Sequence, residues 1–519
     1  MIRILDLTLN PEEAFHPGTV TKKACQAAGI SPNLMPSLTI LKRSVDARQR
    51  PVKVRLQVRL SLGESISPLA DGYNWQDVSN AEPVIIVGSG PAGLCAALRL
   101  VELGLRPVIV ERGRPVEHRK RDIAHLNRNE RLDPESNYCF GEGGAGTYSD
   151  GKLYTRSRKR GEVGRILEIL HLHGAPEEIL YDSHPHIGTD RLPGIIANIR
   201  ATILQCGGEF HFNQRMEELL IREGHLVGII TASGEILEGR AVVLATGHSA
   251  SDVYELLHRH QIDLDAKGFA MGVRIEHPQV LIDQIQYHSK EGRGKYLPAA
   301  EYSLAKNLGG RGVYSFCMCP GGIIVPSATD ENQLVVNGMS NSRRNSPFAN
   351  SGLVVEIRVE DLVEYSEYQH FAGLEYQKFL EKTAHRYGGP GQVAPAQRLA
   401  DFVAGKSSTS LPDHSYHPGL IPSPVHEWLP DAIRMRLQEG LNFFGRRMKG
   451  FLTNEAILVG VESRTSSPVR IIRDPVTLAT PRFPGLFPAG EGAGYAGGIV
   501  SSAMDGENVA LAVKRWLSA

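Results

Sequence analysis

Apolar and polar residues alternate with different periods along the chain, and the period predicts the element. Ile2 to Leu9 alternates residue by residue, which predicts a strand, whereas Val20 to Ala28 has helical spacing. Pro36 to Asp46 and Val52 to Leu62 return to strand patterns. We therefore expect residues 1–80 to form a small N-terminal α/β domain, with docking or regulation as the hypothesis for its role.

A wholly apolar run from Pro83 to Val87 opens a second unit, after a polar, turn-rich segment from Gly63 that predicts a linker. A short run without polar positions is typical of a parallel strand buried on both faces. A helical pattern from Ala92 to Leu103 and an apolar strand from Pro107 to Val110 complete a β-α-β unit. Further strands are expected at 207–212, 217–221, 226–231 and 241–245.

The sequence pattern changes between about 260 and 475. This stretch contains mixed polar strands, turns rich in Gly and Pro, and a helix near Asp431 to Met448. We interpret this stretch as a separate domain that covers a substrate. Residues 478–519 then return to a strand, a glycine-rich turn and a helix.

Composition and charge narrow the class of protein. At 519 residues, with 41% hydrophobic and 22% charged, the chain is long enough for two or three globular domains. Lys+Arg and Asp+Glu both number 57, so charge gives no reason to expect nucleic acid or an anionic membrane as a partner. The basic runs Arg114 to Arg131 and Arg156 to Arg160 are expected to be solvated surface or part of a phosphate-facing rim.

The chain also lacks the patterns of export and membrane insertion. Its start does not resemble a signal peptide, and no apolar run is long enough to span a membrane. Six scattered cysteines do not make a disulfide framework. We expect a cytoplasmic protein that acts on a small molecule, with no nucleic-acid or membrane partner.

The turn Gly88-Ser89-Gly90-Pro91-Ala92-Gly93 is a Gly-x-Gly-x-x-Gly directly after a strand and at the start of a helix. Gly88 permits the tight turn, Gly90 lets the backbone approach a pyrophosphate, and Gly93 lets the helix pack closely on the sheet. The free N–H groups and the positive dipole end of the helix then face the phosphates. A lone motif of this kind is a weak signal, but here it has the strand and helix that it requires.

Glu111 ends the next strand, at the distance from the glycines where a dinucleotide-binding unit places an acid. Its carboxylate can accept hydrogen bonds from adenosine ribose hydroxyls and disfavours a 2′-phosphate, so NADP is not expected there. Arg112 follows it and belongs to the predicted cofactor site. A tight turn that binds nothing is the alternative.

Two later segments favour FAD over NAD. An apolar strand from Ala241 ends in Ala245-Thr246-Gly247, and Pro484 to Gly494 contains Gly490-Glu491. Together with the glycine turn, they resemble the two-dinucleotide-binding flavoprotein superfamily, in which FAD lies across a discontinuous domain closed by the C-terminus. In that superfamily a Gly-Asp holds the ribityl chain. Glu491 is one methylene longer, which puts its contact in doubt.

Longer stretches narrow the resemblance. They are Phe140 to Lys152, Pro185 to Asp190, Val313 to Gly322 and Gly460 to Arg470. With these motifs the chain resembles, over nearly its whole length, the bacterial proteins usually called uncharacterised FAD-dependent dehydrogenases. That label names a cofactor without naming a substrate.

The resemblance implies an α/β fold with a Rossmann-like FAD-binding domain of the glutathione-reductase type. This domain is discontinuous, over 81–258 and 478–519, and an α+β substrate domain is inserted over 259–477. The resemblance also implies that Gly144 and Gly146 lie against the flavin or its pyrophosphate, where only glycine lets the backbone come so close. A plain surface loop is the alternative. The implied cofactor site is completed by Met216 near the adenine and by Thr246, Gly247, Gly490, Glu491, Gly498 and Ile499.

Cys317 and Cys319 form a Cys-x-Cys pair between a predicted strand and a Pro-Gly-Gly turn. A redox pair beside FAD would pass electrons to a disulfide, but a Cys-x-Cys disulfide closes a small, strained ring. Residues two apart on a strand share one face, so two cysteines that merely line a cavity are the simpler picture. Both interpretations stay open.

Three further residues are candidates for catalysis. Arg464 could bind a carboxylate or phosphate, with a surface ion pair as the alternative. His248 follows the Ala-Thr-Gly strand end and could be an acid, a base or a cap. His186 could face the active site. Histidine pairs elsewhere lack an acid at ligand spacing, so no metal site is expected.

The sequence thus predicts an oxidoreductase that transfers hydride or electrons between non-covalently bound FAD and a small organic substrate. A second Gly-x-Gly-x-x-Gly after a strand is absent from the middle region, so NAD(P)H is expected at most as a transient donor. The alternatives are a monooxygenase, a tRNA-modifying flavoprotein and a non-catalytic redox sensor.

Overall fold

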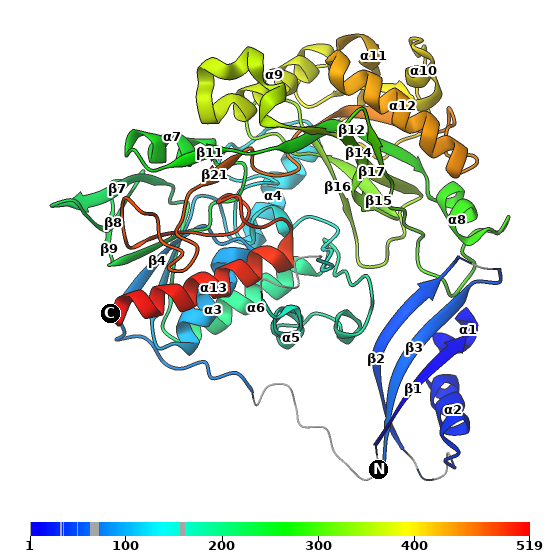
Figure 1. The fold of residues 1–519 in the computed structure, drawn as a ribbon, viewed down its shortest axis with the longest axis horizontal. Coiled ribbons are helices and arrows are strands. Elements are labelled where there is room, and N and C mark those ends of the chain that lie inside the picture. The colour runs from blue at the N-terminus through cyan, green and yellow to red at the C-terminus, as the bar shows by residue number, and fades with distance from the viewer. Residues whose placement is uncertain (1, 32–33, 35, 49, 63–71, 156–160) are drawn as a thin grey trace.

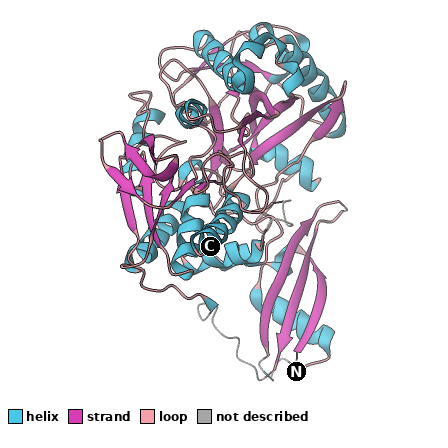
Figure 2. Ribbon diagram, turned by 60° about the vertical axis from the view of Figure 1, so that its left-hand side comes forward, coloured by secondary structure: helices cyan, strands magenta, loops and turns pink. Residues whose placement is uncertain are grey.

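The computed structural model describes residues 2–31, 34, 36–48, 50–62, 72–155 and 161–519. Residues 63–71 of the predicted linker and the basic run at 156–160 lie outside the described residues. The chain forms a small N-terminal unit beside two larger bodies (Figure 1; Figure 2). Among the described residues, no helix is both long and apolar enough to cross a membrane.

The N-terminal unit is a three-stranded antiparallel sheet in the order β1-β3-β2 with two helices packed against it (Figure 1). Leu7, Leu56 and Val58 of the sheet pack against Val20 and Ala24, and so give the unit a core of its own. The predicted strands and helix are confirmed by the observed elements, which are β1 (Ile2–Leu9), α1 (Pro11–Ala14), α2 (Pro17–Ala28), β2 (Ser37–Asp46) and β3 (Lys53–Ser61).

The second body is built on a five-stranded parallel sheet in the order β22-β10-β4-β5-β6. The strands are β4 (Pro83–Val87), β5 (Arg106–Glu111), β6 (Glu209–Phe212), β10 (Ala241–Leu244) and β22 (Leu486–Pro488). Val242 to Leu244 pair with both Val84 to Val87 and the C-terminal strand β22. The FAD-type Rossmann fold is therefore discontinuous, as the resemblance implies.

Both faces of this sheet are buried, which explains its uninterrupted apolar strands. Val84 and Ile86 pack against helices on one face, while Ile85 and Val87 pack on the other. The helices of the first face are α3 (Pro91–Glu102), α5 (Val163–Leu172), α6 (Leu192–Gln205) and α13 (Ile499–Leu517). The second face is covered by α7 (Ser251–Arg259) and by the antiparallel strands β7 (Met216–Arg222), β8 (His225–Thr231) and β9 (Ile236–Glu238).

The third body contains a seven-stranded mixed sheet in the order β13-β14-β17-β12-β20-β18-β19. Its strands are β12 (Phe269–Pro278), β13 (Ala305–Leu308), β14 (Arg311–Cys319), β17 (Phe348–Ile357), β18 (Ala394–Arg398), β19 (Leu420–Pro422) and β20 (Ile457–Glu462). Two further pairs lie beside it, β15 (Gly322–Pro326) with β16 (Val336–Ser340) and β11 (Leu264–Ala266) with β21 (Val469–Ile471).

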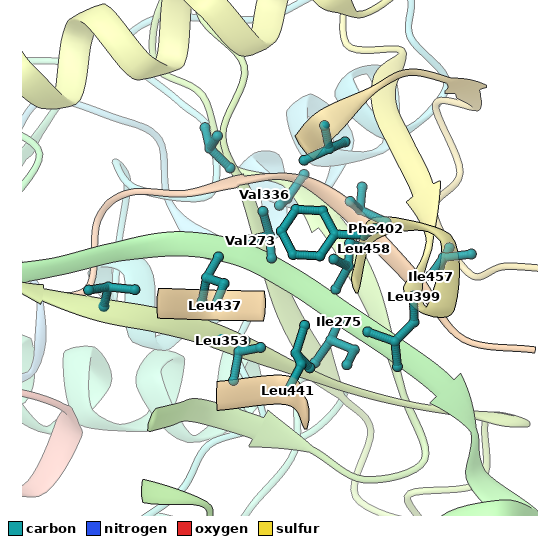
Figure 3. Packing of buried hydrophobic residues seen from close by; sticks show 14 of the residues in the cluster. Val273, Ile275, Val336, Leu353, Leu399, Phe402, Leu437, Leu441, Ile457 and Leu458 are labelled. Atoms are coloured by element: carbon teal, nitrogen blue, oxygen red, sulfur yellow. The ribbon is translucent and has the colours of Figure 1, made fainter. Parts of the chain in front are cut away.

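Helices cover the outer side of this body (Figure 1). Leu437 and Leu441 of α12 pack in one core with Val273, Ile275 and Leu353 of the sheet (Figure 3). The predicted helix near Asp431 is confirmed as α12 (Asp431–Arg447). The other helices of this body are α8 (Gln279–Tyr287), α9 (Ala372–Tyr387), α10 (Leu399–Ala404) and α11 (Val425–Trp428).

Candidate active site

The carboxyl ends of the parallel strands open into a cavity of about 260 Å³ that the third body closes. Ligands of such sheets bind at this edge, because the loops after neighbouring parallel strands converge there. The predicted residues on the cavity wall are Gly88, Gly90, Pro91, Ala92, Glu111, Arg112, Gly144, Gly146, Met216, Thr246, Gly247, His248, Cys317, Arg464, Gly490, Glu491, Gly498 and Ile499. Ser89 and Gly93 support the turn from behind the wall.

The three turn glycines do different work. A Cβ on Gly88, whose φ is +103°, would lie 2.4 Å from the carbonyl oxygen of Ala245, and a Cβ on Gly93 would lie 1.9 Å from that of Gly88. Packing alone therefore requires these two glycines. At Gly90 the nearest atom to a Cβ would be the Cα of Gly144, 3.9 Å away. Space is thus left open at the N-terminus of α3, which fits a pyrophosphate.

Glu111 lies where an adenosine ribose is expected, but the protein already supplies its hydrogen bonds. One carboxylate oxygen accepts from the N–H and hydroxyl of Ser89, at 2.9 and 2.7 Å. The other accepts from the N–H groups of Gly113 and Gly141, at 2.9 and 3.0 Å. Glu111 thereby joins the glycine turn to the second glycine-rich loop, and its ribose contact stays a prediction.

The glycine-rich loop is held by a buried arginine on α4 (Val116–Asn127). Arg119 donates to the carbonyls of Asn137, Tyr138, Gly141, Glu142 and Gly144, and to the hydroxyl of Thr147. The interpretation of Arg114 to Arg131 as solvated surface or rim is wrong for this residue, which is fully buried. A guanidinium with its planar set of donors can satisfy many carbonyls of a tight loop at once.

The C-terminal segment closes the opposite wall. The N–H of Gly490 donates to Asp505 of α13 at 2.7 Å, and Arg473 pairs with Asp505 at 2.7 Å. Asp505 therefore anchors this turn, while Glu491 itself faces the cavity. Burial raises the pKa of Glu491 to about 7, so its carboxyl can hold a proton at neutral pH.

Met216 and Arg112 line the part of the cavity where the adenine of FAD is expected. Met216 is buried at the start of β7. The Arg112 guanidinium lies 4.0 Å from the centre of the Phe140 ring and pairs with Glu135 at 2.7 Å and with Asp252 at 3.2 Å. These contacts fix a cationic, partly aromatic rim where the nucleotide end of FAD is expected.

Two predicted catalytic residues lie between the cofactor wall and the third body. His248 lines the cavity, and burial lowers its pKa to about 4, so its imidazole is neutral at physiological pH. Arg464 lines it too, but its guanidinium donates to both oxygens of Glu381, at 3.0 and 2.9 Å. That ion pair is buried rather than on the surface. A role of Arg464 in holding a substrate anion stays a prediction.

Of the other predicted catalytic residues, Cys317, Cys319 and His186, only Cys317 lines the cavity. Cys317 lines the cavity, whereas Cys319 is buried behind it. His186 does not line the cavity, and its Nε2 lies 3.2 Å from the carbonyl oxygen of Ser342. The idea that both cysteines line the cavity is wrong, because the strand is irregular between Phe316 and Cys319.

Sequence reasoning missed several polar residues on this wall. Lys152 and Asn337 line the cavity, and Asp150 lies beside Lys152 with its oxygen 3.8 Å from the Nζ. Lys152 ends the glycine-rich stretch that carries the family resemblance, so its position there was the available signal. Asn337 lies on β16, in a stretch without any motif.

Comparison with known proteins agrees with this architecture. Residues 268–465 match the family described as FAD-dependent protein, C-terminal domain-like, residues 81–127 match the FAD binding domain, and residues 1–61 match a domain of unknown function. An uncharacterized protein from Clostridium beijerinckii is 40% identical over 530 residues, which covers 98% of each chain.

Solved structures of low similarity include a reductase and a protein in complex with FAD. Quinol fumarate reductase FrdA from E. coli is 13% identical, with a TM-score of 0.37, over 85% of this chain and 70% of that one. CtdE in complex with FAD is 11% identical, with a TM-score of 0.32, over 85% of this chain and 88% of that one.

Proposed function

The chain belongs to the bacterial family of FAD-dependent oxidoreductases, and from this we propose that it is a dehydrogenase or reductase of a small organic substrate. The cofactor is FAD. The proposal concerns what FAD exchanges hydride or electrons with, and where that molecule binds.

One observation carries the proposal. A single cavity runs from the glycine turn at Gly90 to Phe316, Cys317 and Asn337 of the third body. A substrate beside Phe316, Cys317 and Asn337 would therefore lie next to a cofactor bound beside Gly90. The third body would shield both from water. FAD supplies the hydride or electron transfer when bound, so the protein has to orient the substrate and manage protons.

Several residues of the chain are suited to those tasks. Glu491 can hold a proton at neutral pH because burial raises its pKa to about 7. Lys152 keeps its charge, because Cys317, Cys319 and Asp150 outweigh the effect of burial and raise its pKa. We propose Glu491 as the proton-holding group and Lys152 as the group that orients an electron-rich substrate atom.

The electron donor and the partners form part of the same proposal. We propose that NAD(P)H, if it is the donor, binds transiently, since the cavity wall carries one glycine turn of the dinucleotide-binding type. We also propose that the partner of the site is a small molecule rather than a nucleic acid or a membrane, in line with the neutral net charge.

The decisive experiment is anaerobic bleaching of the bound flavin. The FAD-loaded protein is mixed with NADH, NADPH and a panel of metabolites, and loss of the oxidised flavin absorbance is followed. Stoichiometric bleaching by a small organic compound supports the proposal. A flavin that no compound reduces, together with a partner protein that binds only one redox state, contradicts it and indicates a sensor.

Reoxidation in air provides a second measurement. A dehydrogenase or reductase is expected to return directly to the oxidised spectrum. A C4a-hydroperoxide spectrum that persists after reduction would indicate a monooxygenase instead.

A further inference from the structure

The two cysteines meet at an irregularity near the end of β14. The pairing of β14 with β17 shifts register between Phe316 and Cys319, and Cys317 has a φ of +45°, in the left-handed region that few residues other than glycine adopt. This bulge leaves Cys317 on the cavity wall. The thiol of Cys319, buried behind it, lies 3.3 Å from the carbonyl oxygen of Cys317.

The surroundings of the pair contain more positive than negative charge. Three buried or half-buried cations lie there, Lys152, Arg274 and Arg344, with two buried carboxylates, Asp150 and Glu462. The Nη1 of Arg274 donates to both oxygens of Glu462, at 3.0 and 2.9 Å. Arg344 pairs with Asp150 at 2.6 Å. Each carboxylate is thus paired with an arginine, and the ammonium group of Lys152 is the excess positive charge.

Neighbouring acids do not cancel this excess. Burial raises the pKa values of Glu462 and Glu491 to about 7, and their protonation would only enlarge it. Glu301 pairs with His184, which raises the pKa of His184 and, with Arg344 and Lys152 also nearby, lowers the pKa of Glu301. A buried cation needs a nearby anion, because its transfer from water is otherwise costly. A thiolate is the anion that the two cysteines can supply.

The thiol of Cys319 donates to the carbonyl of Cys317, so Cys319 keeps its proton and the thiolate is assigned to Cys317. The Nη2 of Arg274 donates to the carbonyl of Cys317 at 2.8 Å and lies 3.4 Å from the sulfur of Cys319. Lys152 donates to the intervening carbonyl of Met318. The hydrogen bond from Cys319, with Lys152 and Arg274 nearby, holds the pKa of Cys317 well below its usual value, and the same contact raises the pKa of Cys319.

We propose that Cys317 and Cys319 are a dithiol–disulfide couple that exchanges electron pairs with FAD, with organic disulfides and thiols as the substrate class. This inference rests on the proposed function, because it needs FAD in the same cavity. It explains both the position of Cys317 on the cavity wall and the excess positive charge around the pair.

The exchange with FAD balances without an outside proton. In the reduced state Cys317 is a thiolate and Cys319 a thiol. Oxidation breaks the S–H bond of Cys319, forms the Sγ–Sγ bond, and releases two electrons and one proton. Bound FAD would supply the acceptor for these two electrons and that proton, and the reverse step would return them to the cysteines.

The outer step is thiol–disulfide exchange. The Cys317 thiolate attacks one sulfur of an organic disulfide and expels the other half as a thiolate. Cys319 then attacks the sulfur of Cys317 in the mixed disulfide, and its proton leaves with the second substrate thiol. The Cys317–Cys319 disulfide that results would be reduced by two electrons from bound FAD, and a hydride donor such as NAD(P)H would restore those electrons to the cofactor. A small, strained ring favours this reduction.

Thiol chemistry gives the first test. The FAD-loaded protein is oxidised with diamide, blocked with iodoacetamide, and digested for mass spectrometry. A disulfide between Cys317 and Cys319 is expected. In the FAD-free protein, Lys152→Met is expected to move the pH profile of Cys317 alkylation to higher pH, because the excess cation is lost. An unchanged profile contradicts the charge argument.

Flavin bleaching gives the second test. Under anaerobic conditions dithiothreitol is expected to bleach the flavin of the wild-type protein, and Cys317→Ser and Cys319→Ser are expected to lose this reaction. Cys317→Ala serves as a second variant at the strained position. Cys206→Ser, at the buried end of α6, is the matched control and is expected to keep it.

The outcomes separate this inference from the proposed function. If no disulfide forms, or if both cysteine variants bleach with dithiothreitol as the wild type does, the couple is overturned. If NADH or a metabolite still bleaches the flavin in those variants, the protein is an oxidoreductase that does not use the cysteine couple. If the protein forms the disulfide but cannot be loaded with FAD, the proposed function is contradicted, and so is the electron exchange with FAD.

Discussion

Gly90 differs from the other two glycines of the turn, because cofactor binding rather than packing of the fold requires it. A Cβ at Gly88 or Gly93 would collide with backbone, whereas a Cβ at Gly90 would meet only the Cα of Gly144, at 3.9 Å. Gly90→Val should therefore fold but fill the space expected for the pyrophosphate. We expect FAD retention to fall by at least about 100-fold, or about 2.7 kcal/mol.

The measurement is the flavin content of the purified, soluble variant and its titration with FAD. Gly194→Val is the matched control, since a Cβ at Gly194 on α6 meets nothing within 4 Å and lies away from the cavity. Full FAD occupancy in Gly90→Val would show that the turn is not the pyrophosphate site.

A buried acid far from the cavity makes stability depend on pH. Glu276 of β12 is 2% exposed, and burial raises its pKa from 4.5 to about 7. Between these values the folded chain holds a proton that the unfolded chain has lost. The free energy of unfolding therefore falls as pH rises from about 4.5 to about 7. Gln has no such proton to lose.

Glu276→Gln is thus expected to melt close to the wild type at pH 5 and above it at pH 8. The gain at pH 8 is on the order of 1–3 kcal/mol. Gln keeps an acceptor for the N–H of Ser415, which now donates at 2.9 Å. Thermal melts at both pH values test this, with exposed Glu331→Gln as the control. An equal shift at both pH values contradicts the titration.

At the scale of elements, the glycine-rich loop from Asn137 to Thr147 depends on helix α4. Arg119 of α4 donates to five carbonyls and one hydroxyl of this loop. Lysine keeps the charge but offers fewer donors, which leaves buried carbonyls unpaired. Arg119→Lys is expected to cost on the order of 3 kcal/mol and to weaken FAD binding.

The melting temperature of the FAD-free protein and the Kd for FAD measure these two effects. Arg121→Lys, on the exposed side of the same helix, should change neither. If Arg119→Lys lowers stability but leaves the Kd for FAD unchanged, the loop does not form part of the cofactor site.

Elements with a local signal could be predicted from the sequence. The strands and the glycine turn could be predicted, because the period of apolar residues and the spacing of glycines are patterns contained within a few residues. The strands β7 and β8 could be predicted, but β9 and the separate antiparallel sheet that the three strands form could not, since strand pairing is a long-range choice. Arg119 could not be singled out, because nothing local distinguishes a buried cation from a surface one.

At the scale of the molecule, the cavity is assembled from segments far apart in sequence. Gly90, Thr246 and Gly490 follow three neighbouring parallel strands, and Cys317 comes from the third body. The parallel sheet explains why motifs at both ends of the chain could be joined into one site. The wall from the third body could not be predicted, because no short motif specifies how that body docks.

The N-terminal unit is joined to the FAD-binding body by a local contact. The backbone of Arg43 on β2 bonds with Tyr181 and Ser183, at 2.9 Å each, and its guanidinium pairs with Asp182 at 2.6 Å. Val52, which directly precedes β3, belongs to the core of the third body. The unit therefore bridges both larger bodies without lining the cavity.

This arrangement predicts a separable effect of Asp182→Ala. Loss of the carboxylate leaves the Arg43 guanidinium without its partner, at a cost of about 1–3 kcal/mol. We expect faster hydrogen–deuterium exchange in β2, while flavin absorbance and the Kd for FAD stay at wild-type values, because the cavity is not touched. Glu178→Ala, an exposed acid in the same turn, should leave exchange unchanged. A weakened Kd for FAD in Asp182→Ala would mean instead that the N-terminal unit communicates with the active site, and would give it the regulatory role.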